Sequence, residues 1–338
     1  MSDPGLLDDR IATVAACTWL GAIELGEDGF SPMAPSEWNR VAQCLHNAGL
    51  RPRHLLASEV ETSPEIWNEL SEVERQKVLG LRKRAGVVAL ELERLEQRGI
   101  WARARSDEDY PSNIRHKLKN LAAPVLFGSG PSTLPNRKGI AIVGSREIGQ
   151  DLIEVADRMG RLVSRSGLVV VSGGARGTDR IGMNGALERG GQVVGVLSGS
   201  LDRLSRGRDV APYIVEGALC LLSHVHPTAG FSVGTAMARN KLIHSLSDAT
   251  IVISTANGTG WTWAGSMDNL KRGWSPVLVW TGDGAPEANH ALVGKGGFGF
   301  AEIPEDTDGF EALIESAQNH ATERADNERK ATQQSLFP

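Results

Sequence analysis

Two copies of one local pattern, between Gly139 and Leu187, constrain the fold of this chain more than any other feature. Each copy is a short run of β-branched residues, followed by a turn rich in glycine and serine and then by an amphipathic segment. Continuous apolar runs of this kind are typical of strands buried on both faces of a parallel sheet. Apolar residues recur every three or four positions from 148 to 163, which predicts a helix between the two strands. The stretch is therefore predicted to be a βαβ unit of an α/β fold, with its turns at the carboxyl end of the sheet, where such folds bind ligands.

The two turns have the composition of a site for an anion. Glycine and serine let backbone N–H groups and hydroxyls approach a ligand closely, and each turn opens a helix whose N-terminus favours negative charge. Arg146 and Arg176 add guanidinium groups that suit a phosphodiester. The alternative is that the glycines only make tight turns and that both arginines are solvated, but the repetition of the pattern favours phosphate binding. The residues expected to contribute are Gly144, Ser145, Arg146, Ser172, Gly173, Gly174, Arg176 and Gly177.

A third glycine turn, Gly258-Thr259-Gly260, precedes another predicted helix and extends the expected phosphate site. Trp261 and Trp263 follow it and could stack on nucleic-acid bases, although packing in the core is the more common role of tryptophan. The first turn does not match the G-x-G-x-x-G fingerprint of dinucleotide enzymes, and the chain contains no Walker motif. His224 and His226 flank Val225, but without a third ligand nearby we predict no metal site.

Several short segments, through their order and spacing, are similar to one protein family. They include Asp107–Pro111, Val143–Arg146, Ser172–Asp179, Ala238–Ile243, Leu246–Ala249 and Gly258–Thr262. Over about residues 99–300 the chain resembles the DNA-processing protein A family (DprA, also called Smf). The resemblance implies a Rossmann-like, doubly wound, mostly parallel sheet that binds single-stranded DNA and is not itself an enzyme. It also implies a homodimer that protects incoming strands and helps to load a RecA-type recombinase.

The chain departs from the family pattern at several positions. Met183 stands where the family usually has a histidine, and Arg239-Asn240-Lys241 replaces Arg-Asn-Arg, which keeps the charge but loses one bidentate guanidinium. The Tyr-Pro expected soon after Leu201-Asp202 is absent, and no C-terminal winged helix follows the Rossmann-like part. We expect these differences to affect a role in natural transformation more than the fold or the binding of a phosphate-rich ligand.

The chain is predicted to have three parts. Residues 1–98 are expected to form a small all-helical N-terminal domain. Its first helix is predicted from Ile11 to about Gly26, one helix is capped by Ser36, another by Ser63, and a long one starts at Ser71. Residues 99–319 are expected to form the Rossmann-like nucleic-acid-binding domain, in which 201–212 is a basic loop, 277–280 a strand and 310–317 the last helix. Residues 320–338 are predicted to be a flexible polar tail ending in Gln-Gln-Ser-Leu-Phe-Pro.

Composition adds limits on location and partners. No apolar run approaches the roughly 20 residues of a membrane span, so no membrane association is predicted. The three cysteines are odd in number and widely separated, which indicates reduced thiols and a cytoplasmic protein. Residues 137–283 hold 16 Lys and Arg against 12 Asp and Glu, a net charge of +4, whereas the whole chain carries −5. Positive charge is therefore concentrated in the part that contains the glycine turns.

Three hypotheses about function remain open. The leading one is a non-enzymatic protein that holds single-stranded DNA in a groove made by the three turns with Arg239, Asn240 and Lys241, in DNA processing and recombination or in antiviral defence. The second is a regulatory, antitoxin-like module that senses a nucleic acid or nucleotide for a genetically linked partner protein. The third is a LOG-like nucleotide phosphoribohydrolase, which is disfavoured because no glutamate follows Gly258-Thr259 where that chemistry needs one. No catalytic residue, metal or cofactor is predicted.

The last residues carry a separate signal. Gln333, Leu336 and Phe337 fit a short peptide, Gln-x-Ser-Leu-Phe, that resembles those by which bacterial proteins dock on the sliding clamp of the replisome. A polar tail gains no solubility from two adjacent large apolar residues, so these two residues need another explanation, and docking on the clamp is one. The alternative is that Leu336 and Phe337 pack on their own domain or on a dimer partner, since so short a peptide often matches by chance.

Overall fold

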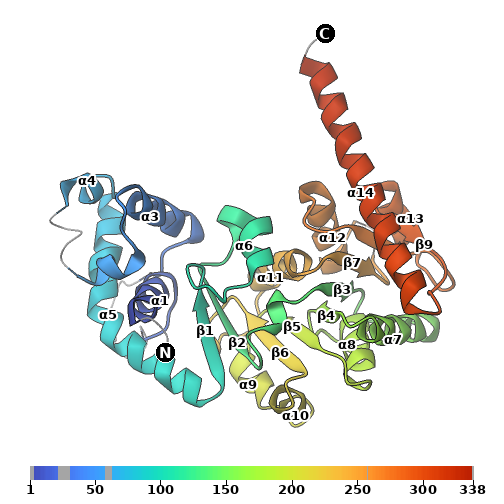
Figure 1. Cartoon of the computed structure of the whole chain (residues 1–338), viewed down its shortest axis with the longest axis horizontal. Coiled ribbons are helices and arrows are strands. Elements are labelled where there is room, and N and C mark those ends of the chain that lie inside the picture. Colours follow the sequence, from blue (N-terminus) through green and yellow to red (C-terminus); the bar gives the residue numbers. More distant parts are fainter. Residues whose placement is uncertain (1–3, 22–30, 58–62, 257, 337–338) are drawn as a thin grey trace.

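A nine-stranded sheet forms the centre of the computed structural model, which describes residues 4–21, 31–57, 63–256 and 258–336 (Figure 1). The strands are β1 (Ile100–Ala104), β2 (Val125–Ser129), β3 (Gly139–Val143), β4 (Val169–Ser172), β5 (Val193–Leu197), β6 (Leu219–Ser223), β7 (Ala249–Val252), β8 (Val277–Trp280) and β9 (Phe298–Phe300). Their order across the sheet is β1-β2-β6-β5-β4-β3-β7-β8-β9. Strands β3 to β9 pair in parallel, while β1 pairs with β2 and β2 with β6 in antiparallel fashion.

Helices cover both faces of this sheet, which confirms the predicted doubly wound, Rossmann-like fold. The helices between successive strands include α6 (Ser112–Leu118), α7 (Gln150–Arg165), α8 (Thr178–Leu187), α11 (Val233–Leu246), α12 (Gly260–Arg272) and α13 (Glu287–Gly294). In β3, Ile140 and Ile142 belong to the core that includes α7 and α8, whereas Ala141 and Val143 belong to the core that includes α6, α11 and α12. Alternate residues of one strand thus serve opposite faces, as the pleat requires.

The N-terminal part is helical, as predicted. Its helices are α1 (Pro4–Cys17), α3 (Pro35–Asn47), the 3-10 turn η1 (Pro52–Leu56), α4 (Pro64–Trp67) and α5 (Glu72–Gln97). Ser63 and Ser71 occupy the N-cap positions of α4 and α5 as predicted. The Ser71 side chain forms a capping box with Glu74, whereas the Ser63 side chain makes no capping hydrogen bond. The predicted cap at Ser36 is wrong. Pro35 fits the first helical position, so the cap is Ala34, whose N–H donates to the Glu37 carboxylate at 2.6 Å.

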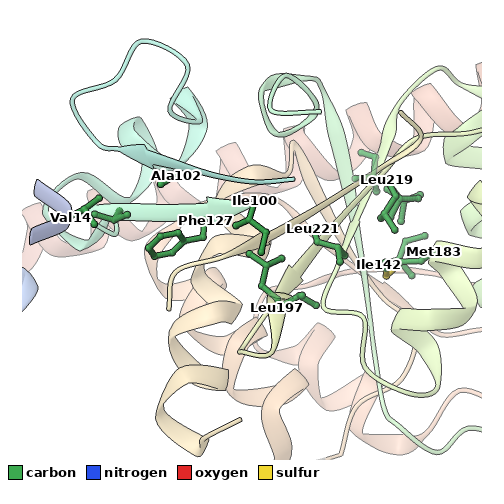
Figure 2. Close-up of a cluster of buried hydrophobic side chains, with 14 of the residues drawn as sticks. Val14, Ile100, Ala102, Phe127, Ile142, Met183, Leu197, Leu219 and Leu221 are labelled. Carbon is green, nitrogen blue, oxygen red and sulfur yellow. The ribbon is translucent and has the colours of Figure 1, made fainter. Parts of the chain in front are cut away.

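The first predicted helix was placed from Ile11 to about Gly26, but α1 begins at Pro4 and ends at Cys17. Gly26 lies outside the described residues. The helix packs on the antiparallel strands, so one hydrophobic core runs from the N-terminal helices into the sheet. Figure 2 shows this cluster, from Val14 of α1 past Phe127 of β2 to Leu221 and Met183.

Two segments predicted to be irregular are helical. The basic loop at 201–212 instead contains α9 (Leu201–Ser205) and the beginning of α10 (Ala211–Val215). Leu201 is fully buried, and the Asp202 carboxylate pairs with Arg98 and Arg206. The buried leucine and the paired carboxylate hold the short helix in place, which overrides the loop-like composition.

The predicted flexible tail is also wrong as far as the structure describes it, because α14 extends from Thr307 to Leu336. Phe310 and Ala317 are buried at its start, and the His320 ring lies 5.7 Å from that of Phe298. Further along, alanine, glutamate, arginine and lysine favour the helix intrinsically. The ion pair between Arg324 and Glu328, at 3.6 Å and four residues apart, supports it. In Figure 1 the end of α14 projects away from the sheet. None of the helices in the described residues is both long and apolar enough to cross a membrane.

Candidate nucleic-acid interface

The three predicted turns meet at the carboxyl ends of β3, β4 and β7. Since β3 lies between β4 and β7, the strand order reverses here, and a crevice opens at such a switch point. Side-chain hydroxyls join the turns: Ser254 Oγ donates to Ser145 Oγ at 3.1 Å, and Thr262 Oγ1 donates to the Gly144 carbonyl at 3.0 Å. Thr178 Oγ1 donates to the Ser145 carbonyl at 3.1 Å. The turns therefore form one connected rim.

A cavity of about 280 Å³ lies inside this rim, bounded also by α11 and α12. Eight of the predicted residues line it: Gly144, Ser145, Arg146, Arg239, Asn240, Thr259, Gly260 and Trp261. Of the lining residues that were not predicted, two are titratable, Asp179 and His244. The cavity thus combines guanidinium groups, backbone turns and one aromatic face, which suits a phosphorylated ligand that carries a ring.

Asp179 is the residue that the sequence reasoning missed. Its side chain is buried, and its Oδ2 accepts a hydrogen bond of 3.2 Å from the Gly173 N–H. Burial raises the pKa of Asp179 above its usual range, while Arg239 and the N–H groups of Ala175, Gly144 and Gly173 act in the opposite direction. The backbone donors expected to face a phosphate are therefore directed at a carboxylate of the protein itself. The signal available in the sequence was an acidic residue in the first turn of a helix after a glycine turn.

Arg239 lies against Asp179 but is only loosely paired with it. Arg239 Nη1 is 3.7 Å from Asp179 Oδ2, the residue is 9% exposed, and its Nε has no hydrogen-bond partner among the described residues. Burial lowers the pKa of Arg239, the Asp179 charge raises it, and the Arg146 charge lowers it. Gly173 makes room for the guanidinium, since a Cβ at that position would lie 1.4 Å from Arg239 Nη1. A buried cation with unused donors is thereby held at the cavity wall.

The two arginines of the turns differ in their surroundings. Arg146 is exposed at the cavity, and it has no ion pair within the part of the chain that the structure describes. Arg176 is 3.4 Å from Glu147, but both side chains are more than three-quarters exposed, so this pair contributes little to stability. Arg146 is therefore the exposed arginine that lines the cavity together with the buried Arg239.

Several predicted residues lie away from the cavity. The Ser172 hydroxyl is fully buried and donates to the Ile142 carbonyl at 2.6 Å, so it joins two strands instead of facing the ligand site. Trp263 packs against the core below α12, which supports the packing role for this tryptophan. Lys241 lines a neighbouring groove between α11 and α12. The other predicted residues that do not line the cavity are Gly173, Gly174, Arg176, Gly177 and Gly258.

A buried polar network supports the cavity from behind. His244 Nδ1 lies 3.1 Å from Thr250 Oγ1, which lies 2.9 Å from Ser275 Oγ, and Asn269 donates to the same serine at 3.1 Å. Burial lowers the pKa of His244 to about 4, with a further contribution from the Arg239 charge. The ring is thus neutral at physiological pH. In the described residues no three His, Cys, Asp or Glu side chains are grouped so that they could hold a metal ion.

Comparison with known proteins identifies relatives of this architecture. Residues 101–267 match the model of the family described as DNA recombination-mediator protein A. The DNA processing protein DprA of Bacillus subtilis (strain 168) is 27% identical over 169 residues, which are 48% of this chain and 55% of that protein. The match therefore spans about half the length of this curated relative.

Two solved structures are also similar. DNA processing protein A from Streptococcus pneumoniae aligns with a TM-score of 0.56 at 18% identity, and the alignment covers 83% of this chain and 98% of that one. DNA processing protein A from Helicobacter pylori, whose structure was described for its single-stranded DNA binding mode, gives a TM-score of 0.49 at 21% identity over 68% of this chain and 96% of that one. The first likeness establishes a shared fold across most of the chain.

Proposed function

Because the chain belongs to the DNA-processing protein A family, we propose that it binds single-stranded DNA at the cavity where the three turns meet. The observation that carries the proposal is the buried Arg239 guanidinium, loosely paired and facing the cavity beside the exposed Arg146. A buried cation whose donors are not used by the protein favours an incoming phosphate oxygen, because a charge-assisted hydrogen bond offsets its desolvation.

The surroundings of the cavity favour binding over catalysis. Asp179 is the one carboxylate that lines it, among the described residues, and it is already bonded to the Gly173 N–H and lies beside Arg239. A base or nucleophile needs a carboxylate that is free to take a proton or attack a substrate, whereas Asp179 is buried and engaged by these protein groups. The His244 ring is likewise engaged, because its Nδ1 shares a hydrogen bond with Thr250 Oγ1 in the buried network.

The proposal predicts how salt and substitution change affinity. The affinity for single-stranded DNA should fall with salt, at about 0.7 in log K per log salt for each neutralised phosphate. Arg146→Ala should weaken binding and reduce that slope by about one phosphate, since the exposed side chain contributes to the site and not to packing. The matched control is Arg189→Ala, which removes an exposed arginine after α8 that does not line the cavity.

The experiment is a fluorescence anisotropy titration with single-stranded DNA, duplex DNA and mononucleotides at several salt concentrations. We expect single-stranded DNA to bind with the highest affinity of the three ligands. Arg146→Ala should lower this affinity, whereas the control Arg189→Ala should not. Equal affinity and equal salt slope for the unsubstituted protein and Arg146→Ala would contradict the proposed site. Preference for a mononucleotide would instead favour the module that senses a nucleotide for a linked partner protein.

The biological setting is a further part of the proposal. Recombination is the setting that family membership supports, with a RecA-type recombinase and a second copy of this chain as partners. A defence role with a genetically linked partner protein is the alternative. Co-purification with RecA and a measured molar mass in solution distinguish the first setting from the second.

A further inference from the structure

A second groove lies next to the cavity, between the outer faces of α11 and α12. It has a volume of about 410 Å³, and its walls include Met237 and Lys241 from α11, Asp268 from α12 and Trp274 after it. Its position explains why Lys241 does not reach the cavity. Residues two apart on a helix point roughly 200° away from each other, so Arg239 and Lys241 face different sides of α11.

The groove and the cavity share a wall. Asn240, His244 and Trp261 line both, and Asn240 Nδ2 donates to the Trp261 carbonyl at 3.0 Å, which ties the two helices together at this point. Gly265 lets the helices come close, since a Cβ there would lie 2.9 Å from Asn240 Nδ2. A polymer that leaves the cavity along Trp261 therefore enters the groove directly.

The charges of the groove favour an anion. Asp268 pairs with Arg272 at 2.9 Å, so its negative charge is offset by a neighbour on the same helix. Lys241 is half-buried and has no ion pair within the described residues. An ammonium group next to an indole face is the combination by which single-stranded nucleic acid is held without regard to sequence.

Resting on the proposed function, we propose that the groove between α11 and α12 is a second nucleotide subsite. Lys241 contacts the next phosphate along the strand, and Trp261, at the shared wall, stacks on the base between the two phosphates. The strand thus bends around α11, and the two charges of Arg239 and Lys241 bind consecutive backbone positions from opposite sides of one helix. Because the groove is continuous with the cavity, a single strand that already occupies the cavity is a better candidate for the groove than a protein.

The test compares two lysine variants on a long single strand. Lys241→Ala should weaken binding several-fold and reduce the salt slope by about 0.7, the contribution of one phosphate. Lys271→Ala is the matched control, because Lys271 is exposed on α12 and does not line the groove. Trp261→Phe should keep most of the affinity that Trp261→Ala loses, since phenylalanine also stacks.

A second readout locates the strand directly. Photo-crosslinking with a single strand that carries 5-iododeoxyuridine should label peptides of α11 and α12 at the groove, in addition to the turns. If Lys241→Ala leaves affinity and salt slope unchanged while Arg146→Ala lowers both, the second subsite is wrong and the proposed function stands. If neither variant has an effect, the proposed function itself fails. If Lys241→Ala changes only the molar mass in solution, the groove binds protein and the subsite is likewise refuted.

Discussion

Gly173→Ala tests the central claim that Asp179 and Arg239 organise the site. The added methyl group would lie 1.4 Å from Arg239 Nη1, 2.4 Å from its Cζ and 2.6 Å from Asp179 Oδ2. No small shift relieves all three contacts, so the guanidinium must leave its position. Asp179 then remains buried with its backbone donors but without the neighbouring cation.

The magnitude follows from the burial of the pair. Separating a buried ion pair so that one charge stays behind costs about 3–5 kcal/mol. The lower end of this range applies here, because Arg239 Nη1 and Asp179 Oδ2 are 3.7 Å apart and the carboxylate keeps its hydrogen bond from the Gly173 N–H. A loss of about 3 kcal/mol corresponds to a melting temperature lower by roughly 6–12 °C for a domain of this size. The salt slope for single-stranded DNA should also fall by about 0.7, because Arg239 no longer faces the cavity.

The assay pairs thermal unfolding with the salt-dependent titration, and Gly294→Ala is the control. Gly294 is the last residue of α13, and a Cβ there meets nothing within 4 Å. Alanine should be tolerated or slightly stabilising at that helical position. If Gly173→Ala melts at the same temperature as the control and binds DNA with an unchanged slope, Arg239 is not held by Asp179 in the way described.

Three further predictions concern other parts of the chain. The pKa values of His224 and His244 are both lowered to about 4, chiefly by burial, so both rings stay neutral in the folded protein. In the unfolded chain both imidazoles become protonated near pH 6.5. The free energy of unfolding should therefore fall as the pH decreases from about 6.5 towards 4, by up to roughly 3 kcal/mol for each ring. Urea unfolding of His244→Asn should show a weaker pH dependence. The purified chain should release no base from nucleoside monophosphates, and base release that is lost on substitution in the turn at 258–260 would restore the phosphoribohydrolase hypothesis. If the last residues, of which Phe337 lies outside the described part of the chain, dock on a sliding clamp, Leu336→Ala combined with Phe337→Ala should abolish binding to the purified clamp and leave DNA binding intact. A loss of thermal stability or of dimerisation in this variant would instead make the tail structural.

Much of the fold follows from local pattern. The β-branched runs at β3 and β4 predict buried parallel strands, and the predicted strand at 277–280 coincides with β8. Such runs predict buried strands reliably, because a strand covered on both faces is apolar at nearly every position. The short α9 was missed, since one buried leucine among arginines carries no detectable period. The charged composition of residues 320–336 is compatible with disorder and with a helix, because the same residues are strong helix formers, and α14 extends to Leu336.

The sequence predicts the glycine turns of the candidate site but not the pair of buried charges behind them. The turns could be identified from glycine and serine alone, because only small residues allow the close approaches found there. The pairing of Asp179 with Arg239 could not, since the two residues are far apart in sequence and meet only when α8 and α11 pack on the sheet. The separation of Arg239 from Lys241 was available in principle from the helical rotation of about 100° per residue. Charge alone does not separate them, because it is the same for both residues, whereas the cavity and the groove lie on different sides of α11.

The two ends of the sheet have a consequence for how copies of this chain can assemble. β1 lies at one edge and is packed by α1 and α5, and the three-residue β9 lies at the other and is packed by α14. An uncovered edge strand offers unpaired N–H and C=O groups to any other chain, and proteins protect such edges by covering or shortening them. A dimer of this protein would accordingly be built from helical surfaces and not from a sheet continued across the interface. Removing α14, whose His320 ring lies against Phe298, would uncover β9 and should favour aggregation through strand addition.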